Sequence, residues 1–231
     1  MLPRAASGDD RMTLWRDGAE RRRAALSEAL RRGIAEAISH VPADRAGARL
    51  HGIAALARCL SAGGAVGALA ASVLGPRAKP VRALLLDKSA AANWSVRWHQ
   101  DRTIAVRKRI ATAGFGPWST KAGIPHVAPP FDMLAAMVTL RVHLDDVDAS
   151  NAPLLVAPGS HRLGPVLEEE IGAAVARCGA RACLAAAGDV WIYATPILHA
   201  SDAARMPARR RVLQVDYAAS DLPRGLDWFG I

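Results

Sequence analysis

Apolar residues recur at helical spacing in the first third of the chain, after a start that has no such pattern. Residues 1–12 carry no periodic apolar positions and predict a loose tail. The positions that would share the apolar face of a first helix are Leu26, Leu30, Ile34, Ala37, Ile38 and Val41. Two more helical segments, at about 50–61 and 65–74, end at Gly75-Pro76, because proline cannot continue a helix. The pattern predicts a mainly helical support over residues 13–80.

From residue 81 onward the chain changes to short apolar runs separated by Pro, Gly and Asn, which are typical of strands. The predicted strands are residues 81–86, 94–99, 138–144, 154–156, 190–193 and 211–217. Helical spacing returns once, so we expect an inserted helix within residues 165–181. Many short strands after a helical lead predict a mainly β fold, a barrel or two-sheet roll over residues 81–220 with flanking helices. A doubly wound parallel sheet would need helices where most of these gaps are loops.

Composition narrows the class of protein. The chain has 231 residues, 51% hydrophobic and 22% charged, which fits one folded domain. Its net charge of +9 could attract nucleic acid, but the basic residues are scattered and not gathered into one block. Three cysteines without metal-site spacing, and a start unlike a signal peptide, favour a cytoplasmic protein with reduced thiols. The apolar stretch at 59–74 is too short for a membrane span, so no membrane partner is expected.

The strand predicted at 94–99 runs into a His-x-Asp triplet. Because side chains alternate along a strand, His99 and Asp101 would project from the same face. One further histidine from a distant strand would complete the set of two histidines and one carboxylate that binds iron in non-haem Fe(II) oxygenases. His199, which follows the strand predicted at 190–193, is the candidate. The triplet alone is a weak signal, since such triplets arise by chance.

Arg210 lies eleven residues beyond His199, at the start of the last predicted strand. A guanidinium there could bind the distal carboxylate of 2-oxoglutarate through two parallel hydrogen bonds. Arg209 and Arg211 compete for this role, because a one-residue slip would point a different side chain inward. The residues on the face of Arg210 would be Val212, Gln214 and Asp216. This face is more polar than that of Arg211, so Arg210 is preferred.

Five segments add a pattern of order and spacing that is far more specific than the triplet. They are WHQD (98–101), GIPHVAPP (123–130), TLRVHLDDVDASNAPLLVAPGSHR (139–162), AGDVWIYATPILHAS (187–201) and RRRVLQVDYA (209–218). Over about residues 80–220 the chain thereby resembles the phytanoyl-CoA dioxygenase family of Fe(II)/2-oxoglutarate-dependent oxygenases. The resemblance implies a single domain over residues 1–231, with a double-stranded β-helix, the cupin-like jelly roll, as its core.

The resemblance also implies roles for individual residues. The family's iron ligands are matched by His99, Asp101 and His199. Arg210 matches the arginine that binds the far carboxylate of 2-oxoglutarate, and Ser201 matches a position that also contacts it. Trp118 lies close to where family members carry a tryptophan beside this cosubstrate. Lys88 resembles a lysine common upstream of the triplet, and Lys88, Arg97 or Arg141 could contact an anionic substrate.

The chemistry implied by the resemblance uses Fe(II), 2-oxoglutarate and O2 to hydroxylate a C–H bond of a small molecule or an acyl-CoA, with release of succinate and CO2. Related halogenating enzymes replace the carboxylate ligand by a small residue; Asp101 is kept in this chain, so hydroxylation, or a desaturating or ring-forming variant of it, is expected. Two alternatives stay open. An AlkB-type nucleic-acid demethylase would suit the charge, although the histidine-to-arginine spacing favours the first interpretation and nucleic acid is not the expected partner. A non-catalytic binding protein could keep the same fold.

Overall fold

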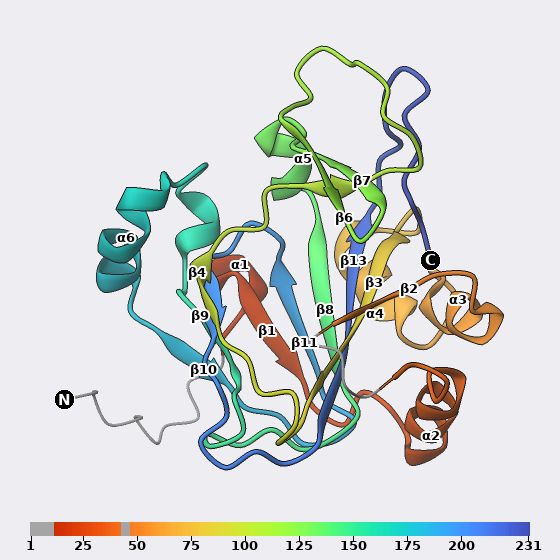
Figure 1. Cartoon of the computed structure of the whole chain (residues 1–231), viewed down its shortest axis with the longest axis vertical. Coiled ribbons are helices and arrows are strands. Elements are labelled where there is room, and N and C mark those ends of the chain that lie inside the picture. Colours follow the sequence, from red (N-terminus) through yellow and green to blue (C-terminus); the bar gives the residue numbers. More distant parts are fainter. Residues whose placement is uncertain (1–11, 43–46) are drawn as a thin grey trace.

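Strands and helices divide the chain much as the pattern predicts. The structure is a computed structural model that describes residues 12–42 and 47–231 (Figure 1). Within these residues, strands dominate from residue 79 onward, and four helices lie before residue 79. The mainly β fold with flanking helices is therefore confirmed. The loose tail predicted at 1–12 lies outside the described residues except for Met12.

The largest sheet, which we call the major sheet, has six strands that pair antiparallel throughout. In spatial order they are β1 (Ala19–Arg22), β11 (Val190–Ala194), β8 (Val138–His143), β13 (Arg210–Ala218), β3 (Lys79–Lys88) and β2 (Ala48–Leu50). The long strands β13 and β3 lie side by side, so that residues 210 and 88 are directly opposite each other. Neighbouring strands in this sheet come from distant parts of the chain, as in a roll.

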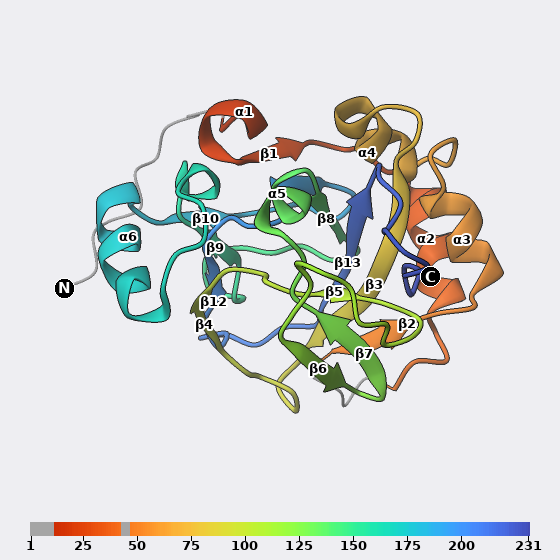
Figure 2. The ribbon, with the colours of Figure 1, turned by 90° about the horizontal axis from the view of Figure 1, so that it is seen from above.

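A second sheet, which we call the minor sheet, faces the major sheet (Figures 1 and 2). Its four antiparallel strands are β10 (Arg181–Cys183), β9 (Leu154–Val156), β12 (His199–Ser201) and β4 (Val96–His99). Side chains from both sheets line one cavity between them. A small third sheet of β5 (Ile104–Ala105), β7 (Ile124–Val127) and β6 (Trp118–Lys121) lies at one end, beside the helix α5 (Phe131–Ala135).

Helices cover the outer face of the major sheet and form the main core with it (Figure 2). They are α2 (Glu28–Ala37), α3 (Ala54–Leu60) and α4 (Gly67–Leu74). Helix α2 begins where the Leu30 N–H donates to the Ser27 side chain at 3.2 Å, a capping interaction that satisfies a free helix-end donor. The buried members of this core include Ile34, Leu56, Leu60, Leu140, Val142, Leu213 and Val215. The helices thus close one side of the sheet, and its other side is left to the cavity.

The minor sheet is covered on its outer side by α6 (Ile171–Cys178), which follows two short 3₁₀ turns, η1 (Ser160–Arg162) and η2 (Glu168–Glu170). A separate apolar cluster joins α6 to this sheet through Ala157, Val166, Ile171, Ala174 and Leu198. The first helix, α1 (Leu14–Asp17), leads directly into β1. The helix predicted within 165–181 is confirmed as α6, shorter than the predicted range.

Alternation along β8 and β13 makes the inner face of the major sheet polar. Leu140 and Val142 point into the helix-covered core, whereas Arg141 between them lines the cavity. On β13, Leu213 and Val215 are in the core, whereas Arg210 and Gln214 line the cavity. Both strands are buried along almost their whole length, so burial alone would not separate the two faces. From these central strands, Arg141, Arg210 and Gln214 therefore face the cavity, whereas other polar residues such as Arg211 do not.

Each strand predicted from the pattern is present, with small shifts at the ends. The mainly helical support over 13–80 also contains β1 and β2, two edge strands of the major sheet that the pattern did not predict. The stretch 59–74 belongs to α3, a turn and α4. Within the described residues, none of the helices has the length and apolar character that crossing a membrane requires.

Candidate active site

The two predicted metal-binding segments meet where β4 and β12 pair. His99 ends β4, Asp101 lies two residues further, and His199 begins β12. In the antiparallel ladder His199 is directly opposite His99, and a bulge follows between His199 and Ser201. Ligand-type atoms of the three side chains all lie within 4.8 Å of one another. The described residues thus bring together the three side chains that the sequence pattern selected.

Both imidazoles are oriented by the backbone. The Nδ1 of His99 is 2.8 Å from the Arg97 carbonyl oxygen, and the Nδ1 of His199 is 2.9 Å from the Ile197 carbonyl oxygen. Each Nδ1–H can donate to its carbonyl, which leaves the Nε2 lone pair free. Burial lowers the pKa of His199 to about 4, so its ring is neutral at neutral pH. A neutral imidazole with a free Nε2 is the form that binds a metal ion.

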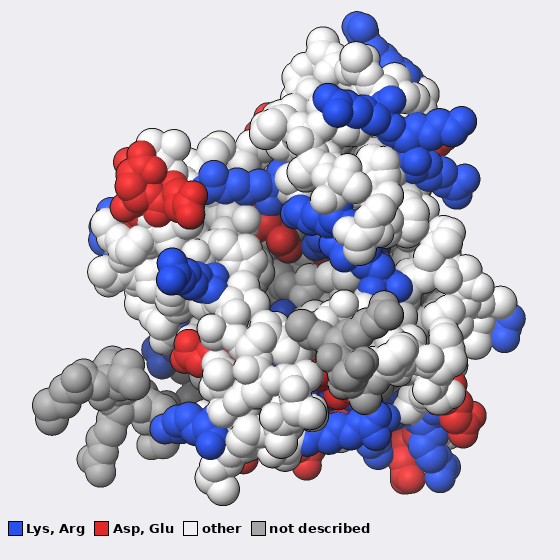
Figure 3. Space-filling view, in the orientation of Figure 1, with Lys and Arg blue, Asp and Glu red and all other residues white. Residues whose placement is uncertain are grey.

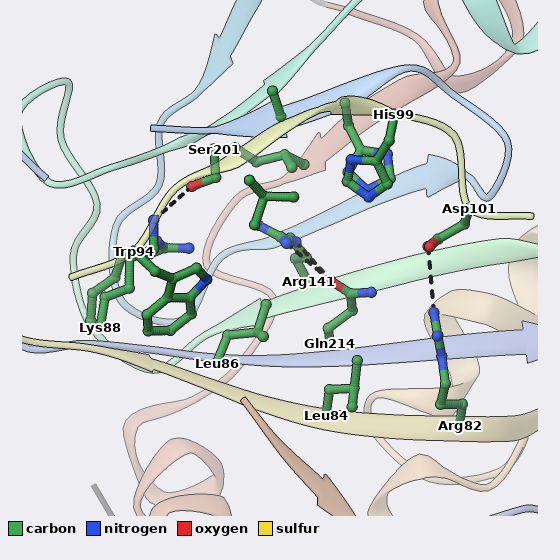
Figure 4. Close-up of a pocket in the computed structure, with 15 residues that line it drawn as sticks. Arg82, Leu84, Leu86, Lys88, Trp94, His99, Asp101, Arg141, Ser201 and Gln214 are labelled. Atoms are coloured by element: carbon green, nitrogen blue, oxygen red, sulfur yellow. Dashed lines mark hydrogen bonds and ion pairs between the residues drawn. The ribbon is translucent and has the colours of Figure 1, made fainter. Parts of the chain in front are cut away.

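Asp101 is kept ionised by a buried arginine on the major sheet. Arg82 donates through Nη2 to Asp101 at 3.4 Å (Figure 4) and through Nε to Asp216 at 2.5 Å. The Thr139 hydroxyl donates to the other oxygen of Asp216 at 3.1 Å. Burial alone would raise the pKa of Asp101, but the charge of Arg82 lowers it below its ordinary value. The carboxylate is therefore available as an anionic ligand.

The residue between the two ligands points the other way and fixes the segment in place. Gln100 accepts a hydrogen bond from the Val166 N–H at 2.9 Å and donates to the Pro196 and Gly164 carbonyls, both at 3.0 Å. Because Pro196 comes just before the β12 strand, Gln100 links both metal-binding segments. Because side chains alternate along the chain, residues 99 and 101 face the cavity, whereas residue 100 points away from it and bonds to the surrounding backbone.

Arg210 lies in the same cavity and has no partner for much of its guanidinium group. Its side chain is 1% exposed, and its Nε and Nη1 atoms have no hydrogen-bond partner. Burial and the nearby Arg141 lower the pKa of Arg210 to about 9, so it stays charged at neutral pH. A buried cation with unsatisfied donors is costly unless an anion binds it, which suits a ligand carboxylate.

Lys88 and Ser201 complete this end of the cavity. Lys88 is the cross-strand neighbour of Arg210, and its Nζ donates to the Ser201 hydroxyl at 3.0 Å and to the Asp202 carbonyl at 2.7 Å. Its Nζ also lies 5.1 Å from the centre of the Trp94 ring (Figure 4). Burial and the charges of Arg210 and Arg141 lower the pKa of Lys88 to about 8. Two cations and a hydroxyl therefore gather at one end.

The competing arginines point elsewhere, in keeping with strand alternation. Arg211 forms a two-point ion pair with Asp145, with donor–acceptor distances of 2.9 and 2.7 Å. Arg209 is mostly exposed and lies 3.7 Å from the Asp87 carboxylate. Arg210 alone of the three lines the cavity. The preference for Arg210 that rested on the polar character of its face thus agrees with the position of its side chain.

The cavity itself has a volume of about 180 Å³. It opens near the hollow at the centre of the face shown in Figure 3 and lies between the two sheets. Its lining residues are Arg82, Leu84, Leu86, Lys88, Trp94, Val96, His99, Asp101, Arg141, Leu154, His199, Ala200, Ser201, Arg210 and Gln214. The iron-type ligands and the cations of the Arg210 end thus share one space, together with an apolar wall.

Two of the predicted residues lie outside the cavity. Trp118 is in β6 and packs against the apolar cluster of the third sheet, with Arg109 5.5 Å from its ring centre. It is not among the residues that line the cavity. The exposed Arg97 is likewise outside the lining. Trp94 lines the cavity instead, although its place at the start of the strand predicted at 94–99 suggested no role for it.

The contact of Arg82 with Asp216 was not predicted from the sequence. Both residues stand on predicted strands, where a charged residue among apolar ones was a usable signal. What the pattern could not supply was the pairing of β3 with β13, which places Arg82 opposite Asp216. Strand order has to be known before such an ion pair can be inferred.

The donor set fits an iron ion and a dicarboxylate cosubstrate. Two imidazoles and one carboxylate on one side of a metal form the set used by non-haem Fe(II) oxygenases, and they leave positions open for other ligands. The unpartnered guanidinium atoms of Arg210 lie in the same cavity and need an anion. The triad and Arg210 therefore fit a metal ion and a dicarboxylate, respectively.

Several solved structures have a similar fold. EctD from S. alaskensis, in its apo form, matches with a TM-score of 0.65 at 18% identity, over 98% of this chain and 84% of that chain. The epimerase SnoN from nogalamycin biosynthesis, in complex with Fe3+, alpha ketoglutarate and nogalamycin RO, matches with a TM-score of 0.62 at 17% identity, over 92% and 88%. HygX from Streptomyces hygroscopicus, with nickel and 2-oxoglutarate bound, matches with a TM-score of 0.61 at 12% identity, over 89% and 84%.

At these identities the similarity establishes the fold, which is the double-stranded β-helix expected from the sequence. A comparison with curated protein sequences finds no match. The family model for phytanoyl-CoA dioxygenase, PhyH, matches residues 3–212, which is most of the chain. We conclude that the chain belongs to the phytanoyl-CoA dioxygenase family.

Proposed function

We propose that this protein is an Fe(II)- and 2-oxoglutarate-dependent dioxygenase that hydroxylates a C–H bond of a small molecule or an acyl-CoA. One observation carries the proposal. The triad of His99, Asp101 and His199 and the unpartnered, buried guanidinium of Arg210 line the same cavity. Neither feature alone would be specific, but together they match a metal ion and an anionic cosubstrate in one site.

The iron would be held by Nε2 of His99, Nε2 of His199 and a carboxylate oxygen of Asp101. The backbone carbonyls that accept from both Nδ1 atoms keep the imidazoles in the metal-binding tautomer. Arg82 holds the Asp101 carboxylate from the side of the major sheet. These contacts fix the ligands before a metal arrives, which lowers the entropic cost of forming the site.

The far carboxylate of 2-oxoglutarate would be held by Arg210, with Ser201 and Lys88 beside it. The Ser201 hydroxyl lies 3.0 Å from Lys88 Nζ and 3.3 Å from the Ala152 carbonyl oxygen, so it can turn from that long hydrogen bond to a carboxylate. Lys88 would therefore support the cosubstrate, a different role from the substrate contact considered from the sequence. A dianion would also relieve the repulsion between Lys88 and Arg210.

Bound iron, 2-oxoglutarate and O2 would supply the oxidation, in which one oxygen atom enters the substrate C–H bond and 2-oxoglutarate leaves as succinate and CO2. The protein's own residues orient the reactants and restrict access by water. The apolar side chains of Leu84, Leu86 and Leu154 form the wall along which a substrate would lie. Because the Asp101 carboxylate occupies the third protein position, the set has no gap for a halide, and hydroxylation is favoured.

A small-molecule substrate fits the cavity better than a nucleic acid does. The cavity of about 180 Å³ lies between two sheets, and Lys and Arg side chains lie over several separate parts of the face in Figure 3. A backbone-binding groove would instead need a continuous basic track. The surplus of positive charge is thus spread over the surface of the chain.

The experiment is an anaerobic titration followed by turnover. Fe(II) and 2-oxoglutarate are added to the purified protein, and the visible charge-transfer absorption of 2-oxoglutarate chelated to Fe(II) is recorded. Oxygen is then admitted and succinate is measured. We expect the absorption to appear in the wild type and to be lost at the same 2-oxoglutarate concentration in Arg210→Met. Absence of both absorption and succinate in the wild type would refute the proposal.

A further inference from the structure

Arg141 is a second buried arginine of the cavity that neither the metal triad nor the Arg210 end requires. It stands in the middle of β8 and is 6% exposed. Its Nε and Nη2 donate to the Gln214 side-chain oxygen at 3.2 and 3.0 Å. Its Nη1 is buried and has no hydrogen-bond partner. One face of the guanidinium group is thus anchored and the remaining donor is left for a ligand.

The backbone position of Arg141 is offset along the sheet from that of Arg210, although the two guanidinium charges are close enough to act on each other. Arg141 is directly opposite Gln214, and Gln214 is four residues beyond Arg210 on the same strand, a separation of roughly 13 Å between Cα atoms. Figure 4 shows Arg141 and Gln214 in the middle of the cavity, with Lys88 and Ser201 to one side and Asp101 and Arg82 to the other. A substrate group bound to Arg141 would therefore lie between the two ends of the cavity, beside the 2-oxoglutarate that would span them.

The charge of the cavity also calls for another anion. The lining has four cationic side chains, Arg82, Lys88, Arg141 and Arg210. Among the described residues, Asp101 and Asp216 pair with Arg82, and the charge of Asp202 also acts on Lys88, which leaves at least one positive charge. Fe(II) and the 2-oxoglutarate dianion would cancel each other. The loaded site would thus keep a positive surplus in a largely buried space, which favours an anionic substrate.

The surroundings of Arg141 combine a polar neighbour with apolar side chains. The buried Tyr193 hydroxyl, on the adjacent strand β11, lies close enough to Arg141 to interact with it, but Tyr193 is not among the residues that line the cavity. Part of the cavity wall is apolar and includes Leu84, Leu86 and Val96. The cavity thus offers one unused charged donor beside an apolar surface, which is the arrangement that binds an organic acid by its carboxylate.

We propose that Arg141 binds a carboxylate of the primary substrate, so that the substrate class is a small organic acid with an apolar body. This inference rests on the proposed function, since it assigns Arg141 to the substrate and Arg210 to 2-oxoglutarate. Arg141 would then determine specificity by orienting the acid in the cavity, with the apolar body against the leucine wall.

The test compares acids with their neutral counterparts on the loaded protein. Anaerobic protein with Fe(II) and 2-oxoglutarate is titrated with 4-phenylbutanoate and with 4-phenylbutanamide, and binding is followed by calorimetry. We expect the carboxylate to bind on the order of 10- to 100-fold more tightly than the amide, as a hydrogen-bonded buried charge provides. This comparison needs no variant, and equal affinities, or no binding of either probe, would overturn the inference.

A variant then assigns the preference to the residue. Arg141→Gln removes the charge and can still pair with Gln214, and it should lose the preference for the carboxylate. Arg141→Lys keeps the charge and should retain part of it. Arg177→Gln, on the exposed side of α6, removes the same charge far from the cavity and should change nothing.

The two proposals fail in different ways. If the wild type gives no charge-transfer absorption with Fe(II) and 2-oxoglutarate, the proposed function is wrong. If that absorption appears and Arg141→Gln weakens 2-oxoglutarate as strongly as Arg210→Met does, Arg141 belongs to the cosubstrate site and the inference on the substrate is wrong. We expect Arg141→Gln to keep the absorption and its 2-oxoglutarate affinity within a few-fold of the wild type.

Discussion

At the scale of single residues, the site is a chain of alternating charges that runs from the sheet to the metal ligand. Asp216 binds Arg82, and Arg82 binds Asp101, the carboxylate nearest to both histidines. Buried charges of this kind cost free energy unless they are paired, and each of these has a partner of opposite sign. The result is a ligand that stays ionised and keeps its orientation.

Loss of the Asp101 carboxylate should weaken iron binding directly. Asp101→Ala removes one of three protein ligands, and we expect the affinity for iron to fall on the order of 100-fold or more, since loss of mere outer-shell partners costs 10- to 100-fold. Iron per protein after desalting measures this. Asp148→Ala, in an exposed turn held by Ser150, is the matched control and should retain iron. Equal iron in both variants would contradict the ligand assignment.

The lowered pKa of Lys88 predicts that cosubstrate binding depends on pH. Its pKa is lowered to about 8 by burial and by its arginine neighbours, and a bound dianion would raise it. Its contribution to binding is therefore full below about pH 8 and is lost as the pH rises through the pKa of the complex. The dissociation constant for 2-oxoglutarate should rise by up to about tenfold from about pH 7 to about pH 9.

Lys88→Met provides the control for this pH effect. The variant should bind 2-oxoglutarate more weakly at neutral pH, and its dissociation constant should change little between the two pH values. A wild type whose affinity is the same at both pH values, or a Lys88→Met variant with the full pH dependence, would remove Lys88 from the cosubstrate site.

At the scale of elements, the two faces of β13 place neighbouring arginines in opposite environments. Arg210 points into the cavity as an unpaired buried cation, and Arg211 points outward into an ion pair with Asp145. Because an unpaired buried charge destabilises the folded state, Arg210→Met should raise the free energy of unfolding of the ligand-free protein by about 1 kcal/mol or more, while abolishing 2-oxoglutarate binding.

Arg211→Met should have the opposite effects on stability and on cosubstrate binding. Loss of the partly exposed, two-point ion pair should lower the free energy of unfolding by about 1 kcal/mol and leave 2-oxoglutarate binding intact. Chemical denaturation and cosubstrate titration of the two variants test the register of the strand directly. If Arg211→Met lost the cosubstrate and Arg210→Met did not, the strand would be shifted by one residue from the register described above.

The elements that could be predicted from the sequence are those with long periodic signals. The strands β3, β8 and β13 and the helices α2 and α6 have clear apolar periods, and alternation on β13 also selected Arg210. Edge strands such as β1 and β2 have too few residues for a period, and their pairing partners lie far away in the sequence. Trp118 shows the limit of a resemblance, because a position near a motif does not fix which sheet the side chain packs against.

At the scale of the whole molecule, the cavity is held between two sheets that meet only in the folded state. Its residues come from β3, β4, β8, β9, β12 and β13 or lie next to them, so no part of the chain could form the site alone. Helices brace the outer face of each sheet. Ligands that bridge the cavity should therefore stabilise the complete fold and not a local segment.

This arrangement predicts a thermal shift on loading. At a hundredfold excess over their dissociation constants, ligands that bind only the folded state add about 2.7 kcal/mol, or roughly 5 to 10 °C for a chain of this size. Fe(II) with 2-oxoglutarate under anaerobic conditions should give a shift of this order in a melting experiment. A chelator should abolish it, and a shift that survives chelation would place the ligand elsewhere.

An anaerobic crystal structure of the protein with Fe(II) and 2-oxoglutarate would show directly whether the triad and Arg210 form one site. We predict one metal ion bonded to Nε2 of His99, Nε2 of His199 and a carboxylate oxygen of Asp101, with the far carboxylate of 2-oxoglutarate on Arg210. A metal ion bound by other residues, or an oxoacid whose far carboxylate is not on Arg210, would contradict this assignment.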